Sequence, residues 1–334
     1  MLKAAVIGLG VGEKHAEAYH AHQKCSVAAL CDLDATRLRE VGERFPDARL
    51  TNNPNDVIAD PDIDVVSIAS YDDNHHDQIV ASLNHGKHLF VEKPVCLTEN
   101  ELSSIRRTLK RNPGLRLSAN LNLRTCPRFA RLREMIAAGD MGDIFLMEAD
   151  YLWGRSHKLT NGWRAKMDYY SIIHGAAVHM IDLVLWSTGK RPTTVQALGN
   201  RIATAGSQLR FNDFAITLLG FDDGSTAKVT GMGGCVHPHF HRVVTYGTKK
   251  TFAHDHNGAR LYITCDPATP PETIEDEYPG VAFKQNLVHT FIDAVRNPGC
   301  EPIVPEQDVF ETMSVCLAAE KAMISRETIT IEYF

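Results

Sequence analysis

The sequence lacks an excess of positive charge and lacks any long apolar run. Its 35 Lys and Arg residues are outnumbered by 41 Asp and Glu, which gives a formal net charge of -6, so the charge predicts no nucleic-acid partner. No apolar stretch approaches the roughly 20 residues that a membrane span requires. The apolar opening at residues 2–9 is interrupted by Lys3 and runs into glycines. That pattern is typical of a strand and not of a signal peptide.

Paired metal-ligand cysteines are also missing. The eight cysteines include no Cys-x-x-Cys motif, which disfavours structural zinc and predicts reduced thiols in a cytoplasmic protein. We expect most of these cysteines to be small buried apolar residues.

The chain is long enough for two domains. Its 334 residues exceed what one hydrophobic core usually supports, so we expect two domains with room for a cleft between them. In residues 1–122, short apolar runs alternate with amphipathic segments, which is typical of repeated β-α units. Continuous apolar strands such as 65–69 predict burial on both faces. The first domain is therefore predicted to be a doubly wound parallel sheet, with strands at 3–8, 27–31, 65–69, 87–91 and 115–119 and helices at 13–22, 35–45, 75–85 and 99–110, the last begun by Thr98.

The pattern changes in residues 123–334, which we expect to form an α+β domain with a large, mostly antiparallel open sheet for substrate binding and oligomerisation. Asp222-Asp223-Gly224 is a hairpin signal between two of its strands. The predicted helices are 127–138, 174–187, 282–296 and 306–324, and the predicted strands are 143–153, 194–202, 214–221, 226–231, 241–247 and 259–264.

A glycine-rich turn lies between the first predicted strand and helix. Gly8, Gly10 and Gly12 leave room for backbone N–H groups and the helix dipole to approach a pyrophosphate. The third glycine of the usual dinucleotide fingerprint would fall at Glu13, so a merely tight turn is the alternative interpretation.

An acidic residue strengthens the dinucleotide interpretation. Asp32 ends the second predicted strand, where an acid can accept hydrogen bonds from ribose hydroxyls. Its alternative role is to cap the next helix, for which Asp34 is at least as good a candidate. An acid at this place repels a 2′-phosphate and favours NAD, whereas nearby Arg37 leaves NADP possible.

Lys93 stands at the end of the predicted strand 87–91, between Glu92 and Pro94. Strand ends of this kind form the ligand crevice of an open parallel sheet. A desolvated lysine there can exchange a proton near neutrality; a solvated charge without a role is the alternative.

His179 and Asp182 are spaced i, i+3 on the predicted helix 174–187, so both face one side of it. The helix is so apolar that it must be largely buried, and a buried histidine is either a catalyst or a satisfied core group.

These motifs, in this order, resemble those of the Gfo/Idh/MocA oxidoreductases, named for glucose-fructose oxidoreductase, inositol dehydrogenase and a rhizopine-catabolism protein. The resemblance covers nearly the whole chain and rests on residues 8–15, 64–70 with His75, 86–88 leading to 92–94, 122–124, 162–164 and 178–183. It implies a dinucleotide-binding Rossmann domain followed by the α+β domain. It also implies hydride exchange between NAD, or NADP, and a carbinol of a sugar, polyol or nucleotide-linked sugar.

The resemblance assigns roles to individual residues. It makes Lys93 and His179 catalytic: His179 removes the hydroxyl proton, and Lys93 orients the oxygen and stabilises its developing charge. The cofactor-binding candidates are Gly8, Gly10, Val11, Gly12, Asp32, Arg37, Ser70, Tyr71, His75, Glu92, Lys93 and Asn122. The substrate-binding candidates are Arg124, Trp163, Arg164, Tyr170 and Asp182. Domain-interface packing is the alternative for Trp163, and orientation of His179 or Arg164 is the alternative for Asp182.

The chain departs from the family pattern at two places. Many relatives carry an aspartate four residues before the histidine, where this chain has Gly175 with His174 beside it. Tyr71 and Asp72 replace the proline and asparagine that many relatives have after the fourth strand, which makes this loop more acidic.

Two rival functions remain open at this stage. One is an NAD-dependent glycosidase that uses transient oxidation, and the other is a non-catalytic dinucleotide sensor. A metal site at His237, His239 and His241 is a third possibility, but Pro238 interrupts the strand and no nearby Cys or carboxylate completes a ligand set. We therefore predict a polar sheet face or cleft wall there and no metal. A homodimer or homotetramer is expected, with no membrane partner.

Overall fold

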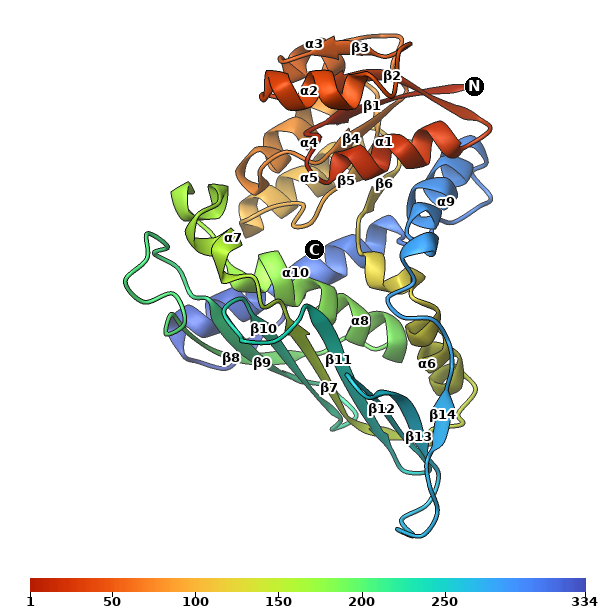
Figure 1. The fold of residues 1–334 in the computed structure, drawn as a ribbon, viewed down its shortest axis with the longest axis vertical. Helices are drawn as coiled ribbons and strands as arrows, with labels where there is room; N and C mark the ends of the chain where they lie inside the picture. Colours follow the sequence, from red (N-terminus) through yellow and green to blue (C-terminus); the bar gives the residue numbers. More distant parts are fainter. The chain divides into compact units, whose positions relative to one another are not determined.

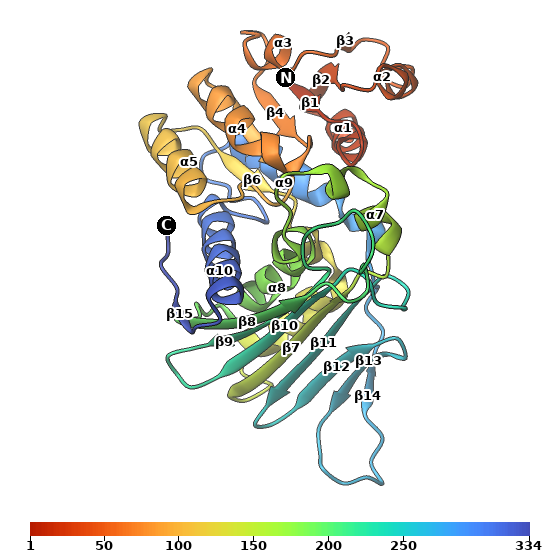
Figure 2. The same ribbon diagram turned by 90° about the vertical axis from the view of Figure 1, so that its left-hand side faces the viewer.

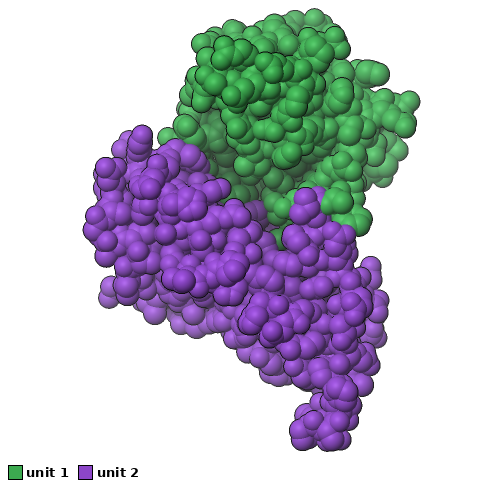
Figure 3. Space-filling view, in the orientation of Figure 1, with its two compact units in different colours: residues 1–125, 282–310, 334 green, residues 126–281, 311–333 purple.

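The computed structural model describes residues 1–334, which form two compact units. Unit 1 comprises residues 1–125, 282–310 and 334, and unit 2 comprises residues 126–281 and 311–333 (Figure 3). The segment 282–310 packs with the N-terminal unit, an arrangement that a single cut between residues 122 and 123 does not describe. The functional boundaries expected from the sequence stay a prediction.

Unit 1 is built on a six-stranded sheet in which every neighbouring pair is parallel (Figure 1). The strand order is β3-β2-β1-β4-β5-β6, so the order reverses between β1 and β4, and a ligand crevice forms at such a switch point. The strands are β1 (Leu2–Ile7), β2 (Cys25–Cys31), β3 (Arg49–Thr51), β4 (Val65–Ile68), β5 (His88–Val91) and β6 (Leu117–Ala119). The predicted doubly wound sheet is confirmed.

Helices cover both faces of this sheet, as its fully buried strand β4 and the buried residues Leu89–Val91 of β5 require. Helix α1 packs beside α9, while α3, α4 and α5 form the opposite layer (Figure 2). Thr98 caps α5 through a capping box with Glu101, as predicted. The helices of unit 1 are α1 (Gly12–Ala21), α2 (Ala35–Gly42), α3 (Pro54–Ile58), η1 (Asp72–Asn74), α4 (His75–Asn84), α5 (Glu99–Arg111), η2 (Asn122–Thr125) and α9 (Gln285–Arg296).

Unit 2 is built on a nine-stranded sheet with the order β14-β13-β12-β11-β7-β10-β9-β8-β15. Only the pair of β7 and β10 is parallel. The predicted hairpin joins β9 and β10, with Gly224 at a φ of 83°. The strands are β7 (Ile144–Leu152), β8 (Thr194–Asn200), β9 (Phe214–Gly220), β10 (Thr226–Met232), β11 (Phe240–Gly247), β12 (Thr251–Asp255), β13 (Gly258–Tyr262), β14 (Glu272–Ile274) and β15 (Ile329–Thr330).

Helices lie on one face of this sheet only. Figure 2 shows α8 and α10 on the same side of the sheet, and α6 packs against α8. The predicted helix 174–187 begins as one π-helical turn, η4 (Ile173–Ala177), before α8 (Val178–Thr188) continues as an α-helix. The remaining helices are α6 (Pro127–Ala137), α7 (Ser156–Thr160), η3 (Trp163–Lys166), η5 (Val281–Phe283) and α10 (Glu306–Ser325), whose first turn, residues 306–310, belongs to unit 1.

The cysteines behave as predicted. All eight are free thiols, and five of them are buried, namely Cys25, Cys31, Cys96, Cys126 and Cys316. None of the helices has both the length and the apolar character that a membrane crossing demands.

Candidate active site

The glycine turn of unit 1 includes two positions, Gly8 and Gly12, where a side chain would clash with its surroundings. Gly8 has a φ of +87°, and a Cβ there would lie 2.3 Å from the carbonyl oxygen of Ala69. A Cβ at Gly12 would meet Val6 Cγ1 at 2.7 Å, whereas Gly10 has open space around it. Because no side chain caps the N-terminus of α1, its first-turn N–H groups suit a pyrophosphate.

Asp32 ties this turn to the end of β2. Its carboxylate accepts a 2.6 Å hydrogen bond from the backbone N–H of Leu9 and a 2.8 Å bond from that of Asp34. Asp34, not Asp32, caps helix α2. The carboxylate of Asp32 is thus held beside the glycine turn, as a group that binds ribose hydroxyls must be.

Glu13, which interrupts the usual fingerprint, has a structural role. It pairs with Arg37 at 3.0 Å and with Arg44 at 2.8 Å. Arg37 also donates to the carbonyl oxygens of Leu9 and Gly10. Its guanidinium is therefore committed to the turn, which leaves it less able to receive a 2′-phosphate.

The loops after β4 and β5 are joined by a buried histidine. The two ring nitrogens of His75 lie 2.6 Å from the carbonyl oxygen of Pro94 and 3.1 Å from that of Ser70. Ser70 donates its hydroxyl to Gln78. Tyr71 is exposed, while Asp72 is buried in η1. His75 thereby connects the loop that contains Lys93 with the loop at the end of the neighbouring strand, β4.

A buried carboxylate stands next to Lys93. Glu92 accepts a 2.5 Å bond from the side chain of Asn120 and lies 3.3 Å from His15 Nε2. Burial raises the pKa of Glu92, but the hydrogen bond and charge of His15, the charge of Lys93 and the bond from Asn120 outweigh it and lower this pKa to about 2. Lys93, which is partly exposed, therefore has a permanent anion beside it.

Arg124 and Asn122 belong to η2. The Arg124 side chain is buried and donates to Asp308 at 2.5 Å and to the carbonyl oxygen of Ile303 at 3.3 Å. This ion pair gives Arg124 a structural role within unit 1, so its contact with substrate stays a prediction. Asn122 receives a hydroxyl hydrogen bond from Thr125 on its carbonyl oxygen.

In unit 2, His179 lies on α8 with only 5% of its surface exposed. Its ring stacks on Tyr151 of β7, with 5.7 Å between ring centroids and 13° between planes. Asp182, three residues on, is fully buried and accepts a 3.2 Å hydrogen bond from Thr312. His179 therefore faces the sheet and Asp182 contacts α10, and the ring of Tyr151 lies nearly parallel to the imidazole.

The segment before this helix forms an aromatic cluster around Arg164. Its guanidinium lies 4.2 Å from the ring centroid of Trp163, 5.1 Å from that of Trp153 and 6.0 Å from that of Tyr170. Such cation–π contacts hold the guanidinium group in place without neutralising its charge.

Position 175 is one of the two places at which the sequence departs from the expected family pattern. Gly175 is buried in η4, and a Cβ added there would lie 2.3 Å from the hydroxyl oxygen of Tyr170. Beside it, burial lowers the pKa of His174 to about 4, so this histidine is a neutral core group at pH 7.

Two family models match the chain. One, described as an oxidoreductase family with an NAD-binding Rossmann fold, matches residues 2–120, and the other, the Gfo/Idh/MocA C-terminal domain, matches residues 129–253. The chain belongs to the Gfo/Idh/MocA oxidoreductase family. It is thus an NAD-binding oxidoreductase.

Individual oxidoreductases and dehydrogenases are similar to this Gfo/Idh/MocA chain in sequence or in fold. The chain is 23% identical to the myo-inositol 2-dehydrogenase of Thermotoga maritima over 99% of both chains, and 25% identical to an uncharacterized oxidoreductase of Bacillus subtilis over 75% of this chain and 73% of that one. Among solved structures, a levoglucosan dehydrogenase in complex with NADH has a TM-score of 0.86 at 19% identity, over all of both chains. The scyllo-inositol dehydrogenase of Lactobacillus casei with NAD(H) and scyllo-inositol has a TM-score of 0.79 at 20% identity, over 99% of both.

The histidine-rich segment of this Gfo/Idh/MocA chain contacts Tyr151, on which His179 stacks. His239 Nε2 lies 3.1 Å from the hydroxyl of Tyr151, and the ring of His241 lies 4.8 Å from the Tyr151 ring. Strand β11 begins at Phe240, so His237 and His239 precede it instead of alternating along it. No three His, Cys, Asp or Glu side chains are grouped so as to hold a metal ion.

Sequence reasoning missed Tyr151 and Tyr278 as members of this cluster. The hydroxyl of Tyr278 lies 2.8 Å from His241 Nδ1. Tyr151 could have been found, because it lies within the expected strand 143–153. Tyr278 could not, since it comes from an irregular segment distant in sequence.

Proposed function

We propose that this chain is an NAD-dependent dehydrogenase that transfers a hydride between nicotinamide and a carbinol of a sugar, polyol or nucleotide-linked sugar. The observation that carries the proposal is the placement of Lys93 beside the buried anion Glu92, at the end of a strand in the sheet whose first turn suits a dinucleotide. The relatives named for inositol and levoglucosan support a substrate rich in hydroxyl groups.

The residues of unit 1 fit NAD. The Gly8–Gly12 turn would hold the pyrophosphate and Asp32 the adenosine ribose hydroxyls, with Val11, Ser70, Tyr71 and Asn122 as further candidates. When bound, NAD supplies the group that accepts the hydride. NAD is favoured over NADP, because Asp32 is anionic and Arg37 is engaged with Glu13 and the turn.

His179 and Lys93 would handle the proton and the charge. His179 removes the proton of the reacting hydroxyl, and its stacking on Tyr151 holds the ring in one plane. Lys93 orients the same oxygen and stabilises its developing negative charge. The carboxylate of Glu92 attracts this ammonium group electrostatically.

The cluster around Arg164 suits recognition of a polyhydroxylated ring. Trp163 and Arg164 are stacked on each other, so they present a planar apolar surface next to hydrogen-bond donors. Tyr170 and Asp182 are the further substrate-side candidates in unit 2, and Arg124 is the candidate in unit 1.

A substrate screen tests this function. Purified protein is incubated with polyols, sugars and nucleotide sugars in the presence of NAD or NADP, and reduced cofactor and product are measured together. We expect reduced cofactor to appear in step with oxidised product, and faster with NAD. Release of sugar without net reduction would show a glycosidase, and dinucleotide binding without any turnover would show a sensor.

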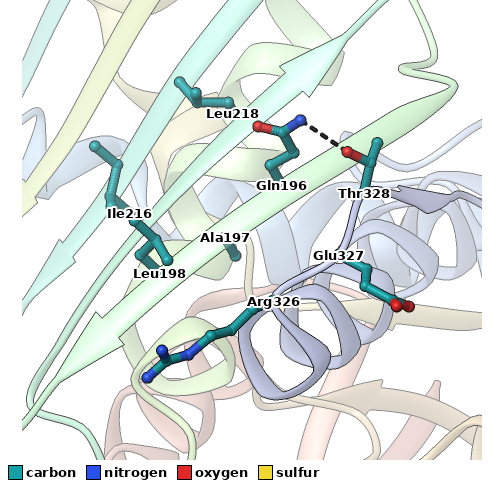
Figure 4. Close-up of a pocket in the computed structure, with 8 residues that line it drawn as sticks. All are labelled: Gln196, Ala197, Leu198, Ile216, Leu218, Arg326, Glu327 and Thr328. Atoms are coloured by element: carbon teal, nitrogen blue, oxygen red, sulfur yellow. Dashed lines mark hydrogen bonds between the residues drawn. The ribbon is translucent and has the colours of Figure 1, made fainter.

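The face of the nine-stranded sheet that carries no helix is proposed to bind a second copy of this chain. Across β8 and β9, Leu198 and Leu218 are 61% and 45% exposed, and both line a hollow of about 310 Å³ together with Ile216 and the segment 326–328 (Figure 4). Two acids and two bases, Glu148, Asp150, Lys228 and Arg242, pair with each other on the neighbouring strands. A face with apolar residues and balanced charge can meet its own copy without repulsion.

A further inference from the structure

We propose that Glu13 determines the preference of this chain for NAD over NADP, because its carboxylate occupies an anion site formed by Arg37 and Arg44. The inference rests on the proposed function, in which NAD is the favoured cofactor. It extends that function by assigning specificity to a residue outside the set expected to bind the cofactor. Removal of the Glu13 carboxylate would open the site to the 2′-phosphate, the group by which NADP differs from NAD.

The carboxylate of Glu13 bridges two guanidinium groups. Its Oε2 lies 3.0 Å from Nη2 of Arg37, and its Oε1 lies 2.8 Å from Nη2 of Arg44. Glu13 is in the first turn of α1, whereas Arg37 is in the first turn of α2 and Arg44 follows the end of α2. Because arginine binds carboxylates and phosphates through the same N–H groups, two guanidinium groups placed in this way also suit a phosphate.

Arg37 lies beside the carboxylate expected to bind the adenosine ribose. Leu9 connects the two groups, since its backbone N–H donates to Asp32 at 2.6 Å and its carbonyl oxygen accepts from Nε of Arg37 at 3.0 Å. Nη2 of Arg37 also donates to the carbonyl oxygen of Gly10 at 3.3 Å. A 2′-phosphate on a ribose bound by Asp32 would therefore lie near this guanidinium, and a nearby arginine is the group that accommodates a 2′-phosphate in dinucleotide-binding folds.

Glu13 opposes a 2′-phosphate in two ways. It accepts the hydrogen bond that Nη2 of Arg37 could donate to the phosphate, and its negative charge repels the phosphate. Isolated surface ion pairs contribute little, in part because two mobile side chains must be ordered. Here the bonds to Leu9 and Gly10 already order Arg37, and the Glu13 side chain is only 22% exposed. The pair is therefore fixed in the arrangement that excludes the phosphate.

The ratio of the affinities for NADP and NAD isolates the effect on the 2′-phosphate. Glu13 is in the first turn of the helix whose N-terminus suits the pyrophosphate, so its removal also changes the electrostatic environment of that group. Both cofactors carry the same pyrophosphate, and this contribution cancels in the ratio. Asp32 still repels the 2′-phosphate in every variant, so the ratio should rise without a complete reversal of the preference.

The test measures the affinities for NAD and NADP by calorimetry in the wild type and in variants. Glu13→Ala removes the carboxylate, and Glu13→Gln removes its charge but keeps its size. Glu13→Ala combined with Arg37→Ala removes the arginine as well. Glu17→Ala is the matched control, because Glu17 lies one turn later on α1 and pairs with Arg44 and Lys14 instead of Arg37.

We expect the affinity for NADP relative to NAD to rise roughly tenfold to a hundredfold in Glu13→Ala, because the phosphate gains hydrogen bonds from a charged group and loses a neighbouring anion. Glu13→Gln should show a smaller rise, since the amide oxygen can still accept a hydrogen bond from Arg37. The double variant and Glu17→Ala should stay within about threefold of the wild-type ratio, since the first lacks the arginine and the second removes a more distant, screened charge.

A second pair of probes tests the adenosine end alone. Adenosine 2′,5′-bisphosphate and adenosine 5′-monophosphate differ by the same 2′-phosphate and lack the nicotinamide. We expect the ratio of their affinities to follow the same order across the variants, because the phosphate meets the same groups of the protein in both pairs of ligands.

These binding measurements separate the inference from the proposed function. If the wild type oxidises no carbinol, the proposed function fails, and the affinity ratios still decide the role of Glu13. If Glu13→Ala does not fold, Glu13→Gln, which keeps the size of the side chain, decides against the wild type alone. The inference would be overturned by a wild type that binds NADP at least as tightly as NAD, by an unchanged ratio in the Glu13 variants, by an equal rise in Glu17→Ala, or by a rise that persists without Arg37.

Discussion

Glu92 shows how one buried carboxylate sets the charge around a catalytic lysine. Neighbouring groups from α1 and from the end of β6, His15 and Asn120, hold it ionised although it is buried. Without them, burial would favour its neutral form, and Lys93 would lose its anionic neighbour. The ionised state of Glu92 beside Lys93 therefore depends on residues outside the segment Glu92-Lys93-Pro94.

Replacing Glu92 by Gln should make unit 1 less sensitive to acid. Since the folded-state pKa of about 2 is below the ordinary value of 4.5 for a glutamate, the ionised group contributes stability that is fully present above pH 4.5 and is lost as the pH falls towards 2. The difference amounts to roughly 3 kcal/mol at about 1.36 kcal/mol per unit. About 2 kcal/mol of it is lost between pH 6 and pH 3, which denaturant unfolding measures, and parallel pH dependences for wild type and Glu92→Gln would contradict it.

Single residues differ in how far the sequence could predict them. Gly8, Asp32 and Lys93 were predictable because each stands at a strand end, where local pattern fixes position. The ion pair of Arg124 with Asp308 was not, since the partners are 184 residues apart. The filling of position 175 by Tyr170 was also hidden, because no spacing rule connects a tyrosine to a glycine five residues later across a π turn.

Helices and strands with a clear periodicity of apolar residues were predicted from the sequence, whereas the shortest strands were not. All strands of the Rossmann sheet except β3 and all long helices had apolar patterns that fixed their type. Strands β3, β14 and β15 have three, three and two residues, too few to show an alternation. Strand β12, Thr251–Asp255, was also missed, although its buried Phe252 and His254 alternate with half-buried neighbours.

The uncovered face formed by strands β8 and β9 makes a prediction about assembly. Leu218→Lys places a charge in the centre of the proposed contact, where a buried unpaired ammonium is costly, so we expect this variant to be smaller than the wild type in sedimentation velocity. Ile202→Lys, which adds the same charge in the exposed loop after β8, is the control and should keep the wild-type size. A wild type that sediments as a monomer at tens of micromolar, or a Leu218→Lys variant of unchanged size, would exclude this face as the contact.

The whole chain divides its tasks between two units of different architecture. Unit 1 combines a parallel sheet with the returning segment 282–310, and its residues suit a dinucleotide. Unit 2 holds His179, Tyr151 and the cluster around Arg164 on the helix-covered side of an open sheet. The two classes of fold were predictable from the change of pattern near residue 122, whereas the return of 282–310 to unit 1 was not, because helix α9 has the same amphipathic character in either unit.

The account depends most on Lys93 acting in the reaction and not in cofactor binding. The decisive measurement compares Lys93→Ala with the wild type in two assays on the same preparations: dinucleotide affinity by calorimetry, and turnover of the best substrate from the screen. We predict that turnover falls by at least about a hundredfold, as for loss of a group that stabilises the developing charge, while the affinity for NAD changes by less than about tenfold. Near-normal turnover in Lys93→Ala, or a loss of turnover that follows entirely from lost NAD binding, would contradict the account.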